Sequence, residues 1–345
     1  MSELIEYIDK FEYVILYRMY CSGHVAEVPS AICGKPVREV ADHIFSDEPS
    51  VMYPSSSIRR AILSDGLWVP YEGNPEEFRK TGPDALCGRN LAEVLLPEGI
   101  INVGNYAFYG CDNLKAVTFP GSLTRIGSGL FYSCQRMRRL TFIAPGSMKR
   151  GADDFTPPLL QEVLEAINQE VEVVVRQRSG KELYRLLFPE FYEEPKENTP
   201  ARVIQVIWHG SGYQYRQCFM SRKLEFHKYD EILPAAIPQE TPGTLIRLCL
   251  DRLKTPVHLS ASGKEVYLSC LKDMTAVLWD FISSDQETDL CEWLEVLDHA
   301  GFYTSDLIDL YIEKASGLRR GDASAYLMDL RHRKFSPARK NKYEF

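Results

Sequence analysis

Apolar residues recur at a fixed interval in the first half of the chain. The stretch LAEVLLPEGIINVGNYAFYGC (91–111) is followed by LKAVTFPGSLTRIGSGLFYSC (114–134), and a third, partial copy begins with MRRLTF (137–142). The first, fourth and sixth residues of each copy are apolar, which predicts a short strand with its apolar side turned inward. A fixed period in the twenties indicates stacked units, each burying its apolar face against its neighbours.

The residues between these apolar positions are expected to point away from the core, because successive side chains of a strand alternate. We expect them to form a surface that binds a protein partner, made of Glu93, Lys115, Thr118, Arg138, Arg139 and Thr141. Stacking would align Glu93 with Ala116 and Arg139. Three of the six residues are basic, which favours an acidic partner through electrostatic steering. An ordinary solvated strand face is the alternative, and the pattern leaves it open.

Both complete copies end on a cysteine, Cys111 and Cys134, three residues after a phenylalanine. A free cysteine behaves as a small buried hydrophobe, so we expect both thiols to be buried and reduced. The alternative is a pair of thiols that binds a metal or does redox work. None of the nine cysteines lies in a C-x-x-C arrangement, which weakens that alternative.

The copies resemble the BspA-type leucine-rich repeat family, whose units carry leucine, valine and proline on a strand, then Ile-Gly, then Ala-Phe and a cysteine. EVPSAICGKPVREVADHIF (27–45) looks like the opening unit, and GPDALCGRNL (82–91) like a degenerate one. The resemblance implies a leucine-rich-repeat solenoid over residues 1–145, with a divergent insertion at about 46–80. It also implies a protein-interaction role with an unknown partner, without catalytic activity or a cofactor.

The periodicity changes in the second half of the chain. Residues 146–224 read as a mixed α/β connecting region, with a strand at VEVVVR (171–176), a helix at KELYRLLF (181–188) and an acidic linker at EEPKENTP (193–200). RVIQVIWHGSGYQYRQCF (202–219) fits either a hairpin about its glycines or a strand that runs into a helix.

Residues 225–335 carry the apolar spacing of helices. Within them Trp293, Leu294 and Leu297 align with Tyr326, Leu327 and Leu330 at an offset of 33. This is the ankyrin period, although the ankyrin signature T-P-L-H-x-A is missing, so the resemblance is loose. Residues 336–345 form a basic tail. The expected fold class is therefore α+β, a repeat solenoid followed by a mostly α-helical C-terminal domain.

Composition narrows the possible partners. The 345 residues are 45% hydrophobic and 26% charged, which is normal for a soluble globular protein. The net charge of −8 gives no general electrostatic reason to bind nucleic acid or an anionic membrane. The N-terminal MSELIEYIDKFEY has acidic residues where a signal peptide needs positive charge, and runs such as YVILY (13–17) are too short to span a membrane. We therefore expect a cytoplasmic protein.

A second candidate site lies at the junction 202–227, where polar and aromatic residues concentrate. An enzyme or small-ligand binder would use Trp208, His209, Ser211, Tyr213, Tyr215 and Arg216. A nucleophile elbow around Ser211 would need glycines where His209 and Tyr213 stand, so a glycine turn is the simpler interpretation. The spacing of His209, Cys218 and His227 matches no zinc motif, and we expect no metal site.

Overall fold

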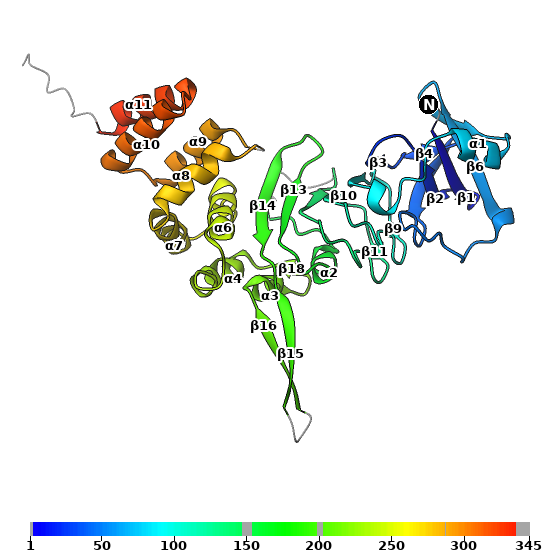
Figure 1. Cartoon of the computed structure of the whole chain (residues 1–345), viewed down its shortest axis with the longest axis horizontal. Coiled ribbons are helices and arrows are strands. Elements are labelled where there is room, and N and C mark those ends of the chain that lie inside the picture. The colour runs from blue at the N-terminus through cyan, green and yellow to red at the C-terminus, as the bar shows by residue number, and fades with distance from the viewer. Residues whose placement is uncertain (1–2, 147–153, 199–202, 287, 336–345) are drawn as a thin grey trace, which may run out of the picture. The chain divides into compact units, whose positions relative to one another are not determined.

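The structure, a computed structural model, describes residues 3–146, 154–198, 203–286 and 288–335 (Figure 1). The chain divides into two units, Met1–Ile232 and Leu233–Phe345. The basic tail expected at 336–345 lies outside the described residues.

The repeat strands stack in a six-stranded sheet of the first unit, in the order β14–β13–β12–β10–β8–β3 (Figure 1). Strands β3 to β13 pair in parallel, and β14 adds an antiparallel edge. The bounds are β3 (Val25–Glu27), β8 (Glu93–Leu95), β10 (Ala116–Pro120), β12 (Arg139–Ile143), β13 (Val171–Arg176) and β14 (Glu182–Phe188). Because each repeat adds one strand to the same sheet, equivalent residues of successive repeats stand opposite one another.

A second sheet of the first unit has the order β11–β9–β5–β2–β1–β6–β7, with β4 paired to β5. Its strands are β1 (Leu4–Asp9), β2 (Val14–Tyr20), β4 (Ala31–Ile32), β5 (Lys35–Val40), β6 (Ile58–Ser64), β7 (Leu67–Pro70), β9 (Asn102–Val103) and β11 (Arg125–Ile126). Strands β9 and β11 come from the return half of the repeats and continue in parallel from β5.

The segment that fits the repeat poorly, residues 46–80, has its own secondary structure. It contains the 3-10 helix η1 (Ser55–Ser57), the strands β6 and β7, and most of the helix α1 (Pro75–Thr81). Strand β6 pairs antiparallel with β1, so this segment extends the second sheet. A further 3-10 helix, η2 (Gly88–Asn90), precedes β8.

Stacked aromatic rings run through the core of the repeats. Phe108 lies between Phe45 and Phe131, with ring centroids 5.6 and 5.3 Å away and nearly parallel planes. The Cys111 thiol donates to the main-chain oxygen of Phe45 at 3.2 Å, and the Cys134 thiol to that of Phe108 at 3.0 Å. Both cysteines are free and at most 2% exposed. The predicted burial of the two thiols is confirmed.

Two predictions for the connecting region are wrong. The segment 181–188, expected as a helix, contains strand β14, which pairs with β13. Its apolar residues face both sides of the sheet and are all buried, so the run lacks the alternation that marks a half-buried strand. The segment expected as a linker at 193–200 belongs, over its described part, to strand β15 (Tyr192–Asn198).

The glycine-containing segment 202–219 takes the second of its two expected forms, a strand that runs into a helix. Strand β16 (Val203–His209) pairs antiparallel with β15, and helix α3 (Gly212–Arg216) follows. The first unit is completed by α2 (Leu160–Glu165), β17 (Phe219–Met220), β18 (Lys223–Leu224) and α4 (Phe226–Glu231).

The second unit is helical over its described residues. Its helices are α5 (Leu233–Ala236), α6 (Pro242–Lys254), α7 (Ala261–Lys272), α8 (Thr275–Ser284), α9 (Leu290–Ala300), α10 (Ser305–Gly317) and α11 (Gly321–Phe335). Side chains that accept a main-chain N–H begin four of them: Thr241 for α6, Ser260 for α7, Asp289 for α9 and Thr304 for α10. Such N-caps satisfy N–H groups that lack partners within the helix.

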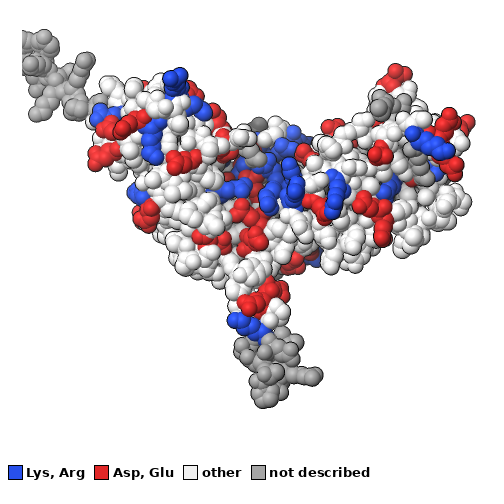
Figure 2. Space-filling model, viewed as in Figure 1, with Lys and Arg blue, Asp and Glu red and all other residues white. Residues whose placement is uncertain are grey.

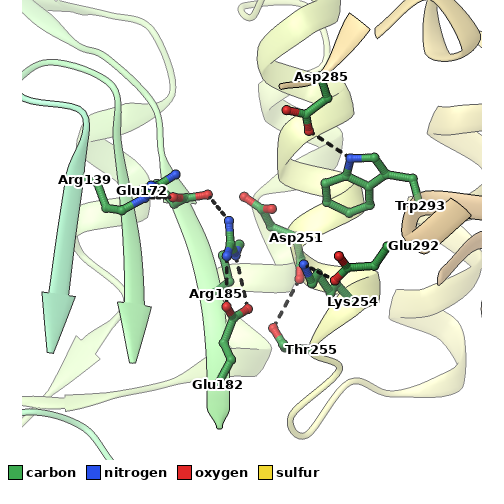
Figure 3. A network of polar contacts seen from close by, with 10 residues as sticks. All are labelled: Arg139, Glu172, Glu182, Arg185, Asp251, Lys254, Thr255, Asp285, Glu292 and Trp293. Carbon is green, nitrogen blue, oxygen red and sulfur yellow. Dashed lines mark hydrogen bonds and ion pairs between the residues drawn. The ribbon is translucent and has the colours of Figure 1, made fainter. Parts of the chain in front are cut away.

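The residues aligned at the offset of 33 lie in α9 and α11. Trp293, Leu294 and Leu297 are buried in α9, as are Leu327 and Leu330 in α11. The Trp293 indole donates to Asp285 at 2.9 Å, and Lys254 pairs with Glu292 at 2.7 Å (Figure 3). The ankyrin interpretation of this offset stays a prediction.

Candidate functional site

The register of the repeat strands is the one that the alignment of the copies predicts. Ala116 of β10 stands opposite Glu93 of β8 and Arg139 of β12, and Thr118 stands between Leu95 and Thr141. These rows of opposed residues continue beyond the repeats into β13, where Glu172 stands opposite Arg139. The outward positions therefore form rows across the sheet.

An ionic network occupies the β12–β14 end of this face (Figure 3). Glu172 is 3% exposed and accepts from Arg139 on one carboxylate oxygen and, at 2.7 Å, from Arg185 on the other. Arg185 also makes a two-pronged contact with Glu182, at 2.9 and 3.1 Å. Arg139 is therefore neutralised locally by a buried carboxylate, and it is not a free cation of the surface.

The six residues predicted for binding differ in accessibility. Thr118 and Thr141 are buried and Glu93 is half-buried, whereas Lys115 and Arg138 are exposed and directly precede strands β10 and β12. Among the contacts of the described residues, the guanidinium of Arg138 donates only to the main-chain oxygen of Met137, at 3.1 Å. Figure 2 shows that Lys and Arg side chains gather over β12 to β14, with acidic side chains beside them.

The sequence reasoning did not single out Glu172 or Arg185. The only signal for Glu172 is a charged residue inside the otherwise apolar run VEVVV (171–175). A buried charge requires a partner, because desolvation without one is costly. Arg185 was placed on a helix, where its pairing across the sheet could not be inferred.

The aromatic residues of the second candidate site pack against one another. Trp208 stacks on Tyr213 with ring centroids 3.8 Å apart. His209 stacks on Tyr192 at 4.5 Å, and its Nε2 contacts Glu194 of strand β15 at 2.8 Å. These contacts fasten the base of the β15–β16 hairpin.

Arg216 is 2% exposed and is enclosed by main-chain oxygens. Its guanidinium donates to five carbonyls, those of Leu164, Ile167, Gln169, Pro189 and Gly212, at 2.6 to 3.3 Å. Burial lowers the pKa of Arg216 to about 10. Ser211 and Tyr215 are fully buried beside it on the same helical segment. The arrangement ties helix α3 to the segment that follows α2, which accounts for these polar residues structurally.

The structure contains no helix, among the residues it describes, with the length and apolar character needed to cross a bilayer. The location expected from the sequence stays a prediction.

Comparison with known proteins shows what the repeats are similar to. No curated protein matches the chain. Among solved structures, the chain is similar to a leucine rich repeat protein of T. pallidum, with 24% identity, a TM-score of 0.20, and coverage of 40% of this chain and 68% of that one. It is also similar to a leucine rich cell surface protein of Faecalibacterium prausnitzii A2-165, with 14% identity, a TM-score of 0.24, and coverage of 51% and 42%.

The family model described as "BspA type Leucine rich repeat region (6 copies)" matches residues 75–151. The match covers both complete copies, with their phenylalanine and cysteine positions stacked one above the other. Residues 75–151 of this chain are therefore similar to the BspA-type leucine-rich repeats.

Proposed function

We propose that the protein is a protein–protein interaction module whose repeat solenoid presents the outward face of β8, β10 and β12 to a partner. The observation that carries this proposal is the in-register stacking of Glu93, Ala116 and Arg139 across three strands. Stacked repeats offer extended surfaces of this kind for binding. The proposal invokes no catalysis, cofactor, metal, nucleic acid or membrane.

Charge on this face favours an acidic partner. Lys115 and Arg138 are exposed directly before the neighbouring strands β10 and β12, and their main chains are joined by the hydrogen bond from Arg138 N to Lys115 O at 2.8 Å. Arg139 is paired with Glu172, so its charge is compensated and it adds little to the attraction of an acidic partner. Exposed charges at an interface act mainly through steering and specificity, and their effect falls as salt rises.

The test exchanges the two exposed cations for acids. The full-length Lys115→Glu, Arg138→Glu variant should keep its fold and lose its partner when immobilised protein captures ligands from a lysate of the source organism, read by mass spectrometry. Arg139 is left unchanged, because a carboxylate there would face the buried Glu172. Lys10→Glu, Lys228→Glu makes the same charge change at exposed positions elsewhere and serves as the control. Capture that is unchanged in the first variant, with the same salt dependence, would contradict the proposal.

A further inference from the structure

The return half of the repeats carries a group of exposed aromatic rings. Tyr106, Tyr109 and Tyr132 are 38%, 36% and 64% exposed. Tyr109 stacks on Tyr132 with centroids 5.6 Å apart, and Tyr106 meets Tyr109 edge-on at 6.1 Å. His43, from the opening unit, stacks on Tyr106 at 5.3 Å. We call His43, Tyr106, Tyr109 and Tyr132 the tyrosine ledge.

The ledge is held rigidly by the main chain of three stacked units. His43 N donates to Asn105 O at 2.9 Å, Tyr106 N to Ser128 O at 2.9 Å, and Gly110 N to Tyr132 O at 3.0 Å. Gly129 has φ +63°, and a Cβ there would collide with the ring of Tyr106, so the ring lies directly on this glycine. A surface whose rings are already ordered loses little conformational entropy when a ligand binds.

Nothing within the repeats requires these tyrosines to be exposed. Their neighbours in the motif, Phe108 and Phe131, fill the core, whereas Tyr109 and Tyr132 follow them and point outward. No hydrogen bond to the hydroxyls of Tyr106, Tyr109 or Tyr132 is formed by the described residues. Clustered exposed aromatic residues mark binding surfaces more often than isolated ones do.

The segments that build the ledge contain acidic residues. The three segments that build it, 42–48, 105–112 and 128–135, contain Asp42, Asp47, Glu48 and Asp112, and none of them contains Lys or Arg. Asp42 lies next to His43 and accepts from Asn105 N at 2.7 Å. Asp112 follows Tyr109 by three residues. At the rim, Arg89 pairs with Asp112 at 3.2 Å, and the exposed Arg136 directly follows the third segment.

We propose that the tyrosine ledge binds a cationic peptide segment of a partner protein. Lys or Arg side chains of the segment would lie over the faces of the tyrosine rings, where the ring quadrupole attracts a cation. The carboxylates on the ledge supply complementary charge and disfavour acidic ligands. This surface is separate from the outward strand face, and the proposal does not depend on the function assigned to that face.

The test uses the full chain and fluorescein-labelled peptides in anisotropy titrations. A peptide of alternating arginine and glycine should bind, the corresponding lysine peptide more weakly, and the glutamate peptide not at all. Tyr109→Ser, Tyr132→Ser should weaken binding of the arginine peptide by about 5- to 30-fold, as expected for the loss of two exposed cation–π contacts. Asp112→Asn should weaken it and reduce its salt dependence.

Two further variants separate binding from folding. Tyr109→Phe, Tyr132→Phe keeps the ring faces and should retain affinity, while Tyr192→Ser removes a tyrosine that is 55% exposed on β15 and should change nothing. Far-UV circular dichroism checks that each variant is folded. Unchanged affinity in the Tyr→Ser pair, an equal loss in the Tyr→Phe pair, or comparable binding of the glutamate peptide would each overturn the proposal.

Discussion

Replacing Phe108 by alanine tests whether the repeats share one continuous core. The side chain is fully buried and stacks on rings from the units before and after it. Truncating a core phenylalanine costs about 3–5 kcal/mol, through lost burial and the cavity left behind. Each aromatic pair adds about 0.5–1.5 kcal/mol beyond its buried area. Because Phe108 loses two such pairs, we expect a cost in the upper half of that range.

A loss of this size is a large share of the total stability of about 5–15 kcal/mol that is typical of a domain. Urea unfolding followed by circular dichroism gives the free energy, and native-state labelling of Cys134 reports the repeats specifically, since its thiol bonds to the main chain of Phe108. Phe11→Ala, at a position 87% exposed, is the matched control and should change stability by less than about 0.5 kcal/mol.

The double variant Phe108→Ala, Phe131→Ala carries the sharper test. The two rings are 5.3 Å apart, so the cavities merge and the two costs should not add. Strict additivity, or a cost of the single Phe108 variant near that of Phe11→Ala, would refute the stacked arrangement of the units.

Three other predictions concern buried polar groups. Burial raises the pKa of Cys134 from 9.0 to about 12 and that of Cys111 in the same direction, so thiol reagents at pH 8 should label both only after denaturation. Both pKa values are raised in the folded state, so the stability contributed by the neutral thiols is complete below about pH 9 and is lost as the pH rises toward 12. Alkaline unfolding of the Cys134→Ser variant, compared with that of the parent protein, measures this loss. Glu172→Gln should lower the free energy of unfolding by about 1–3 kcal/mol, because Arg139 and Arg185 then face an uncharged side chain. An unchanged free energy in urea unfolding would mean that the network contributes nothing to stability.

Local pattern determined the repeats of this protein and much of their packing. The alternation L-x-x-V-x-L at a fixed period defines which side chains turn inward, and the equivalence of Cys111 and Cys134 follows from the same period. Parallel stacking then leaves one register that keeps apolar residues inside, which is why the opposition of Ala116 to Glu93 and Arg139 was predictable. The aromatic positions of the ledge are visible in the motif, but their gathering with His43 is not, because it depends on the opening unit.

Only the tertiary structure decided the secondary structure of residues 181–198 and which cations of the strand face are paired. The apolar run in β14 is compatible with a helix or with a strand buried on both faces, and pairing with β13 selected the strand. Arg139 reads as a free surface cation until Glu172 stands opposite it, 33 residues further along the chain. Arg216 reads as a candidate site residue until five carbonyls enclose it. For Arg139 and for four of the five carbonyls around Arg216 the deciding contacts come from residues 27 to 52 positions away, and a local pattern contains no information about such partners. Strand β14 pairs with its neighbour in sequence, β13, so there it is burial on both faces that hides the strand from a local pattern.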